Sequence, residues 1–223
     1  MTVAWDFGDG TTAAEPFGVA VSHSYVEPGD HTVTAEAIGH NAGAATVTAR
    51  SRNLLVSDDQ ASFEGAALAG WTGNNATVAV TDERAAHGQY SLLVTITGAS
   101  PASADARVSV TNPGVDIDGR LLTFIASLWV PYAGRSGRLT VGYLDATGTQ
   151  FGSAQQLTNQ TLAANQWTQL RADLVMREGS VGFLLRLVVA GGVTGDLFYA
   201  DRVGVFLGAV QSPDWALPSA TPA

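Results

Sequence analysis

The side chains able to do chemistry in this chain are mainly carboxylates, because it holds 20 Asp and Glu, four His and no Cys. Without Cys there is no thiolate nucleophile, no disulfide and no Cys-bound metal. The sequence shows no nucleophile elbow, no His-Glu-x-x-His motif and no phosphate-binding glycine loop. His87 is the one histidine after residue 50, so a Ser-His-Asp triad there would depend on it. We therefore predict that the chain is not an enzyme.

Sugar binding is a second kind of chemistry that the side chains could support. In the run Leu121–Val130 the even positions are apolar, whereas the odd positions are mixed and end at Trp129. Tyr143 and Arg186 stand in two similar runs further on, and Tyr132 follows the first run. Sugar rings stack on aromatic faces while their hydroxyls need hydrogen-bonding groups. These four residues therefore predict a sugar-binding sheet face; the alternative puts Trp129 in the core and Arg186 on a solvent face or protein interface.

The elements that must position these residues are short strands separated by Gly, Asn, Asp and Pro. The stretches with period-two alternation are Thr32–Ile38, Thr46–Ala49, Thr77–Val80, Ser91–Thr97, Arg107–Val110, Leu121–Val130, Leu139–Leu144, Gln166–Leu174, Val181–Val189 and Leu197–Phe206. Such spacing is typical of antiparallel sandwiches and barrels. We therefore expect an all-β protein.

The charge balance excludes some partners. There are 11 basic residues, all of them Arg, and the net charge of −9 gives a pI of about 4.7. An acidic protein is repelled by phosphate backbones and by anionic lipid surfaces, so we expect neither nucleic acid nor membrane as a partner. The longest apolar run, Leu121–Val130, is too short to cross a bilayer.

The first fifty residues contain a compact turn motif, Trp5-Asp6-Phe7-Gly8-Asp9-Gly10, in which Asp-Gly favours a tight turn. His23-Ser24-Tyr25 follows, and then a Gly turn leads into the strand Thr32–Ile38. Together these motifs resemble a PKD domain over about residues 2–50. The resemblance implies an Ig-like β-sandwich, here residues 1–52, that spaces or presents neighbouring domains and binds partners. We expect Asp6 and Asp9 to serve the turn rather than a metal.

This first domain departs from the PKD pattern at its start. A PKD domain has two strands before its Trp-Asp-Phe-Gly-Asp-Gly element, whereas only four residues precede Trp5 here. Either the sequence is a piece of a longer protein, or the missing strands come from elsewhere. An incomplete sandwich exposes unpaired strand edges, which favours pairing with another chain. A homo-oligomer formed through this domain is one expected outcome.

The second segment shows its own ordered series of short motifs. They are Asn53-Leu54-Leu55, Phe63-Glu64-Gly65 with Gly70-Trp71, Gly88-Gln89-Tyr90-Ser91-Leu92, Trp167-Thr168-Gln169-Leu170 and Phe198-Tyr199-Ala200-Asp201-Arg202-Val203. This order resembles the jelly-roll carbohydrate-binding modules of the CBM4/CBM22-like, galactose-binding-domain-like group over residues 53–208. The resemblance implies a larger antiparallel sandwich, with Trp71 and Trp167 in its core, and a polysaccharide of a cell surface or cell wall as partner. Residues 209–223, rich in Pro, are predicted to form an extended tail.

The same resemblance implies a structural calcium ion that ties the first strand of the sandwich to the last. Glu64 and Asp201 stand at the matching acidic positions, with backbone oxygens near Ala66 and Ser91 as companions. Oxygen ligands of this kind suit Ca²⁺. The family often has a second Asp after the one matched by Asp201, and here that residue is Arg202. The alternative is that Glu64 and Asp201 form a turn or pair with Arg202.

The setting of the protein is predicted from the same features. The first residues lack a basic segment followed by a long apolar one, so we expect no usual export signal. Together with the two resemblances, this favours a virion protein, such as a phage tail or capsid-decorating protein, assembled in the host cytoplasm beside other virion proteins. The first alternative is a fragment of a secreted bacterial glycoside hydrolase or surface protein. The second is a purely structural virion module without a sugar ligand.

Overall fold

The computed structural model describes residues 1–23, 29–49, 53–55, 58–98 and 104–209. The chain divides into two compact units whose main segments are Met1–Arg52 and Asn53–Gln211. All but the first residue of the predicted tail 209–223 lie outside the described residues, as does Tyr25 of the first motif. None of the described helices is long and apolar enough to cross a membrane.

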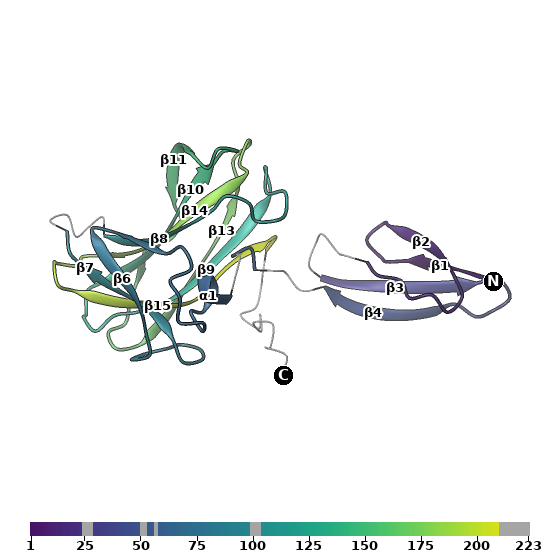
Figure 1. The fold of residues 1–223 in the computed structure, drawn as a ribbon, viewed down its shortest axis with the longest axis horizontal. Helices are drawn as coiled ribbons and strands as arrows, with labels where there is room; N and C mark the ends of the chain where they lie inside the picture. Colours follow the sequence, from purple (N-terminus) through teal and green to yellow (C-terminus); the bar gives the residue numbers. More distant parts are fainter. Residues whose placement is uncertain (24–28, 50–52, 56–57, 99–103, 210–223) are drawn as a thin grey trace. The chain divides into compact units, whose positions relative to one another are not determined.

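The N-terminal unit is a four-stranded antiparallel sheet in the order β2-β1-β3-β4 (Figure 1). Its strands are β1 (Thr2–Asp6), β2 (Thr12–Pro16), β3 (Gly29–Ala37) and β4 (Gly43–Ala49). The register places Trp5 between Ala13 and Ala35, so these three side chains share one face. That face is only half-buried at Trp5, and Phe7 is the buried hydrophobic residue among the described residues of this unit.

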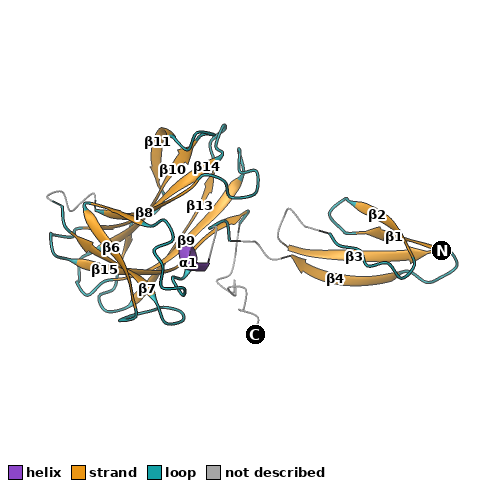
Figure 2. Cartoon of the chain, viewed as in Figure 1, coloured by secondary structure: helices purple, strands orange, loops and turns teal. Residues whose placement is uncertain are grey.

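The second unit is built almost entirely from strands (Figure 2). Its elements are α1 (Asp58–Ala61), β5 (Thr72–Asn74), β6 (Ala76–Thr81), β7 (Ser91–Ile96), β8 (Asp105–Val110), β9 (Leu121–Trp129), β10 (Ser136–Leu144), β11 (Gln150–Gln156), β12 (Gln160–Thr161), β13 (Trp167–Val175), β14 (Gly182–Ala190) and β15 (Leu197–Leu207). One sheet has the order β11-β10-β14-β8-β5, with β12 added beside β10. The other has the order β13-β9-β15-β7-β6. The named strands of both sheets pair antiparallel.

The core of the second unit lies between its two sheets. The even positions of β9, among them Phe124, point into it, as the alternation of the sequence predicted. Phe124 meets Phe183 of the other sheet edge to face, with ring centroids 5.8 Å apart. Trp71 and Phe63 are fully buried in the same core. The all-β class, with an antiparallel sandwich as its larger part, is therefore confirmed.

Candidate functional site

The four aromatic and basic residues predicted to bind sugar do not share one face. Trp129 lies on β9, whereas Tyr143 on β10 and Arg186 on β14 belong to the other sheet. Tyr143 points into the core, where its ring lies 6.1 Å from that of Phe151. The prediction of a common face is wrong because alternation along one strand says which residues lie together on that strand. It does not say which sheet the strand joins.

Trp129 is 5 % exposed and its ring is covered. The guanidinium of Arg84 lies 3.9 Å from the ring centroid, and Tyr199 meets the ring edge to face at 5.4 Å. The hydroxyl of Tyr199 donates to Glu83 at 2.6 Å, and burial raises the pKa of that hydroxyl. With its face occupied by Arg84, Trp129 has no surface left for a sugar ring in this structure.

Tyr132, in the loop after β9, is the one exposed member of the predicted set of aromatic residues. The guanidinium of Arg135 lies 5.5 Å from its ring centroid and is anchored by an ion pair with Asp196 at 2.6 Å. Trp167, which we expected in the core, is half-buried and lies beside Trp129 in the register of β13 and β9. It occupies the outer face of its sheet, because Leu170 and not Trp167 belongs to the core.

Arg186 lies on the outer face of the other sheet, at the centre of a row of polar residues. The register aligns Gln156, Thr140, Arg186, Arg107 and Thr72 across β11, β10, β14, β8 and β5. Residues aligned in this way point to the same side of a sheet. These five side chains, each able to form hydrogen bonds, therefore lie next to one another in a row that crosses the sheet.

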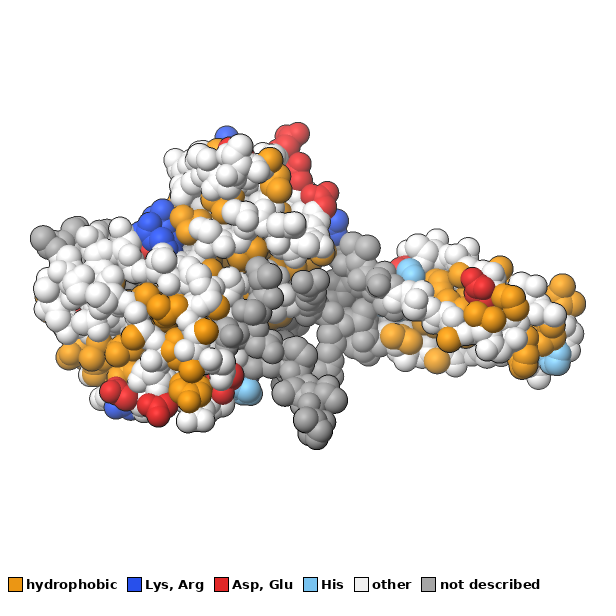
Figure 3. All heavy atoms as spheres, viewed as in Figure 1, with side chains coloured by type: hydrophobic (Ala, Val, Ile, Leu, Met, Phe, Trp, Pro, Cys, Tyr) orange, Lys and Arg blue, Asp and Glu red, His pale blue; other side chains and the backbone are white. Residues whose placement is uncertain are grey.

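Two further rows flank this central row on the same side. One aligns Arg138, Val188, Asp105 and Asn74, and the other aligns Gly142, Leu184 and Ser109. Gln150 completes the surface, since its side chain lies against Gly142, where a Cβ would be 2.7 Å from Oε1. We call the residues of these three rows, together with Gln150, the polar face. In Figure 3 arginine side chains gather in a hollow of the surface beside β8.

The arginines of the polar face differ in their partners. Arg107 makes a two-pronged ion pair with the buried Asp105, at 2.7 and 2.9 Å. Arg138 donates to the amide oxygen of Asn159 at 3.3 Å. Arg186 donates weakly from Nη2 to Gln150 at 3.4 Å, and its Nε is buried without a hydrogen-bond partner. Sequence reasoning found Arg186 and missed the rest, although an Arg inside each of two further strands was a signal that could have found Arg107 and Arg138.

Glu64 and Asp201, the predicted calcium ligands, hold two ends of the same loop. Asp201 accepts from the amides of Ala86 and His87 at 2.7 and 2.9 Å, and from that of Arg202 at 2.6 Å. Glu64 accepts from the amides of Gln89 and Tyr90 at 3.0 to 3.2 Å. The loop passes so close to Glu64 that a Cβ on Gly88 would lie 2.3 Å from the Glu64 carboxyl carbon, which favours glycine at this position.

The carboxylates of Glu64 and Asp201 give this loop the negative charge that a cation needs, but they supply few side-chain ligands. Burial, with a contribution from the charge of Glu64, raises the pKa of Asp201 to about 6 despite its backbone hydrogen bonds. All the donors to the two carboxylates are neutral amides. Calcium takes six to eight oxygens, and among the described residues no group of three or more acids or histidines gathers. An ion here would therefore depend on backbone carbonyls for most of its ligands.

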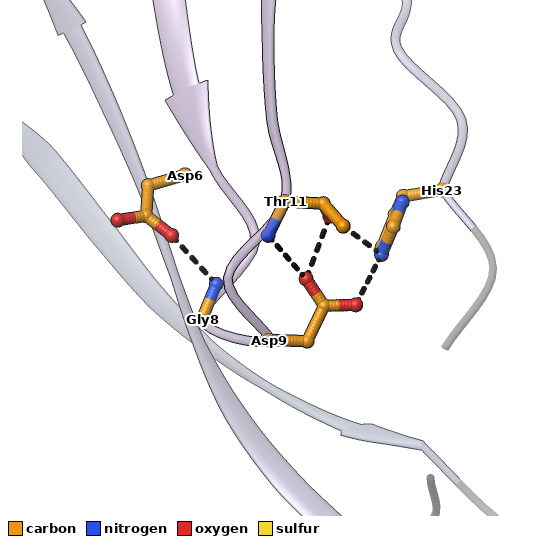
Figure 4. Close-up of polar contacts among 5 residues, drawn as sticks. All are labelled: Asp6, Gly8, Asp9, Thr11 and His23. Carbon is orange, nitrogen blue, oxygen red and sulfur yellow. Dashed lines mark hydrogen bonds and ion pairs between the residues drawn. The ribbon is translucent and has the colours of Figure 1, made fainter. Parts of the chain in front are cut away.

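The turn motif of the N-terminal unit is stabilised by its own carboxylates (Figure 4). Asp6 accepts from the amide of Gly8 at 2.9 Å, and Asp9 accepts from the amide and hydroxyl of Thr11. The other oxygen of Asp9 lies 2.7 Å from Nε2 of His23, whose ring stacks on Phe7 at 4.1 Å. These hydrogen bonds, first that of the Thr11 hydroxyl and then that of His23, hold the pKa of Asp9 well below its usual range. The contacts are those of a structural turn.

Comparisons with known proteins agree with both units. Residues 1–53 match the family model of the PKD domain. The CBM22-1 xylan-binding domain of Paenibacillus barcinonensis Xyn10C is similar in structure at 23 % identity and a TM-score of 0.53, with 66 % of this chain and 91 % of that domain covered. The C-terminal family 22 carbohydrate-binding module of Clostridium thermocellum Xyn10B gives 22 %, 0.54, 66 % and 91 % for the same quantities. No curated protein matches the chain.

A viral protein shares the fold as well. Tailspike protein 4 of bacteriophage CBA120 is similar at 13 % identity and a TM-score of 0.52, over 70 % of this chain and 21 % of that one. At such identities the likenesses establish the fold and leave the ligand open. The two resemblances seen in the sequence, a PKD domain followed by a CBM22-like jelly roll, are confirmed.

Proposed function

We propose that the chain is a non-catalytic glycan-binding protein whose binding surface is the polar face of the second unit. The observation that carries the proposal is the central row from Gln156 to Thr72, which presents hydrogen-bonding side chains across five neighbouring strands. A polysaccharide needs such an extended row of donors and acceptors for its hydroxyl groups. Leu184 and Val188, which lie on either side of Arg186 in β14, are buried, so the exposed groups of this surface are mainly polar.

A structural neighbour supports the choice of this fold for a glycan ligand. The Clostridium thermocellum module has conserved amino acids in a cleft that take part in ligand binding, and the Paenibacillus domain is a xylan-binding domain. The neighbours come from xylanases and from a phage tailspike. We therefore keep two settings as proposals: a virion protein that attaches to a host surface glycan, and a binding module of a secreted glycoside hydrolase or surface protein.

The proposal can be tested by blocking the polar face without disturbing the core. Ser109 is exposed on this face, so Ser109→Trp should cover the row while the strand keeps its inward residues. Gln169→Trp is the matched control, because Gln169 is exposed on β13 of the other sheet. In depletion assays against a panel of plant and bacterial wall polysaccharides, the wild type and the control should bind and Ser109→Trp should not. Equal binding by all three proteins would move the site elsewhere, and no binding by the wild type would favour the purely structural module.

We propose that the N-terminal unit binds a partner that covers its apolar face. Among its described residues Phe7 alone is a buried hydrophobic, while Trp5 and Val33 on the same face of the sheet are half-exposed. A single sheet needs a second layer to bury such a face. The candidates are another copy of this chain, a neighbouring domain or a second virion protein. Native mass measurement separates the first from the others, because a homo-oligomer would show multiples of 23.0 kDa.

A further inference from the structure

The polar face lacks the side chains that neutral sugars usually require. None of the residues that form its three rows is aromatic, and neither is Gln150. Of the three aromatic residues predicted for the sugar-binding face, Tyr143 lies in the core, Trp129 lies on the other sheet under Arg84, and Tyr132 lies in the loop after β9. Pyranose rings gain much of their binding energy from stacking on aromatic faces. A ligand of this face must therefore be recognised mainly through polar groups.

Two arginines of the same face form no ion pair with a carboxylate among the described residues. Arg186 and Arg107 stand directly opposite each other on β14 and β8. Like charges in this position destabilise a sheet. Asp105 neutralises Arg107, whereas the contacts of Arg186 and Arg138 are with the amide oxygens of Gln150 and Asn159.

Arg186 also has an unused donor. Its Nε is buried without a partner, and the bond from Nη2 to Gln150 is long at 3.4 Å. A buried donor that is left unpaired costs free energy, and a charged one costs more than a neutral one. A guanidinium offers two parallel N–H groups that match the two oxygens of a carboxylate. A ligand carboxylate that displaces Gln150 would neutralise the charge of Arg186 and accept hydrogen bonds from two of its N–H groups at once.

We propose that the ligand of the polar face is an acidic glycan, and that Arg186 binds the carboxylate of a uronic acid residue, with Arg138 as a second cation beside it. This inference rests on the proposed function, since it names the class of glycan that the same face binds. The net charge of −9 argues for a local contact rather than general attraction, because the whole protein repels polyanions. Nucleic acid, which binds through extended basic surfaces, is a poor match for the same reason.

The test compares each acidic polysaccharide with its own neutral form. The probes are polygalacturonate, glucuronoxylan and alginate, each beside a carboxyl-reduced preparation, with dextran sulfate as a second kind of anion. Affinities of the full chain are measured by titration calorimetry or affinity electrophoresis. We expect at least one acidic form to bind tenfold or more tightly than its reduced form, and the difference to shrink severalfold when the salt concentration is raised. Dextran sulfate should bind more weakly than that uronate, because its anionic groups are not planar carboxylates.

Variants test whether the preference for the acidic polysaccharide depends on Arg186. Arg186→Gln should lower the affinity for the acidic form about tenfold and the affinity for the reduced form much less, because Gln keeps a hydrogen-bonding amide in the row but has no charge for the carboxylate. Arg138→Gln should act in the same direction with a smaller effect. Arg171→Gln is the matched control, because Arg171 is exposed on the other sheet and pairs with Asp173 at 3.2 Å. Thermal midpoints equal to that of the wild type show that the variants are folded.

The outcomes separate the two proposals. Equal affinity for acidic and reduced forms would overturn the acidic-glycan inference and leave the glycan-binding proposal standing. So would an acid preference that Arg186→Gln leaves intact, or tighter binding of dextran sulfate than of any uronate. Failure of the wild type to bind any of the polysaccharides, acidic or reduced, would overturn the proposed function itself.

Discussion

The two units of this chain differ in how completely they bury the apolar faces of their β-sheets. The second unit stacks two sheets, and Phe124, Phe183, Trp71 and Phe63 are fully buried between them. The N-terminal unit is one sheet, and among its described residues Phe7 alone is a buried hydrophobic. A sheet with one apolar face gains most of its stability from whatever covers that face. The comparison teaches that the second unit has its own source of stability, while the first leaves its apolar face half-exposed at Trp5 and has the hydrogen bonds of its turn; the partner proposed above would cover that face.

The two units also differ in what ionisation of a carboxylate does to them. In the N-terminal turn, hydrogen bonds from Thr11 and His23 favour the charged form of Asp9 and lower its pKa. In the second unit burial disfavours the charged form of Asp201 and raises its pKa to about 6. A lowered pKa stabilises the fold at neutral pH, whereas a raised pKa stabilises it at acidic pH. Protonation of Asp9 and protonation of Asp201 should therefore change the stability of their units in opposite directions.

The largest difference in stability loss between the two units should come from removing an aromatic ring from the closed core of the second unit. Phe183→Ala deletes a fully buried side chain that meets Phe124 across the two sheets, and such changes cost about 3–5 kcal/mol. Phe7→Ala should cost less, because the neighbouring Trp5 is half-exposed and the site can close around the gap. Hydrogen exchange of amides in β9 and β14, compared with those in β1 and β3, measures each unit separately. A loss for Phe7→Ala as large as that for Phe183→Ala would show that the first unit has a closed core of its own.

The next prediction concerns Asp201. A shift of its pKa from 3.8 to about 6 makes the second unit about 2–3 kcal/mol more stable below pH 4 than above pH 6. The folded state holds the proton more tightly, so this contribution is present at low pH and is lost as the pH rises from about 4 to about 6. Asp201→Asn should remove this part of the pH dependence, measured by urea unfolding at several pH values. Identical pH slopes for wild type and variant would contradict the assignment.

The proposed calcium ion should act on the same carboxylate with a smaller effect. Calcium binds the ionised form, so it should raise the thermal midpoint at about pH 7.5 more than at pH 5. An ion at tenfold its dissociation constant contributes about 1.4 kcal/mol, which corresponds to a few degrees for a unit of this size. Equal midpoints in calcium and in EDTA would show that calcium does not stabilise this unit. A rise in the midpoint that persists in Asp201→Asn would show that the calcium ion binds away from Asp201.

Much of the fold could be predicted from local pattern. The alternation in residues 121–130 gave the inward face of β9 correctly, because the period of two follows from strand geometry alone. β11 was missed, because its sequence Gln-Phe-Gly-Ser-Ala-Gln-Gln is mostly polar and its side chains are mainly exposed, so no apolar period marks it. The strand exists because β10 pairs with it, and such pairing is a property of the tertiary structure.

The candidate site was predicted less well than the fold. Arg186 was found because a charged residue inside an apolar strand has few structural reasons to be there. Its neighbours Thr140 and Arg107 come from strands distant in sequence, and only the order β10-β14-β8 brings them together. Trp129 was assigned to the sugar site for its residue type, yet a ring over which Arg84 packs has a partner already. Register and sheet order, which fix these neighbours, are long-range properties that a sequence pattern does not contain.

The smallest expected effect lies in the N-terminal turn and has the opposite sign to that of Asp201. Because the pKa of Asp9 is lowered, the stability it contributes is present above its ordinary range near pH 4 and is lost as the pH falls below that range. The amide of Phe7, which donates to the carbonyl of Thr11 across the turn at 3.1 Å, should therefore lose protection from exchange between about pH 5 and pH 2.5. Asp9→Asn should show little further loss over this interval. Asp6→Asn is the matched control, since Asp6 caps Gly8 in the same turn without contacting His23. Acid-dependent protection that survives in Asp9→Asn would mean that another group controls the turn, and the contrast between the two units would then rest on burial alone.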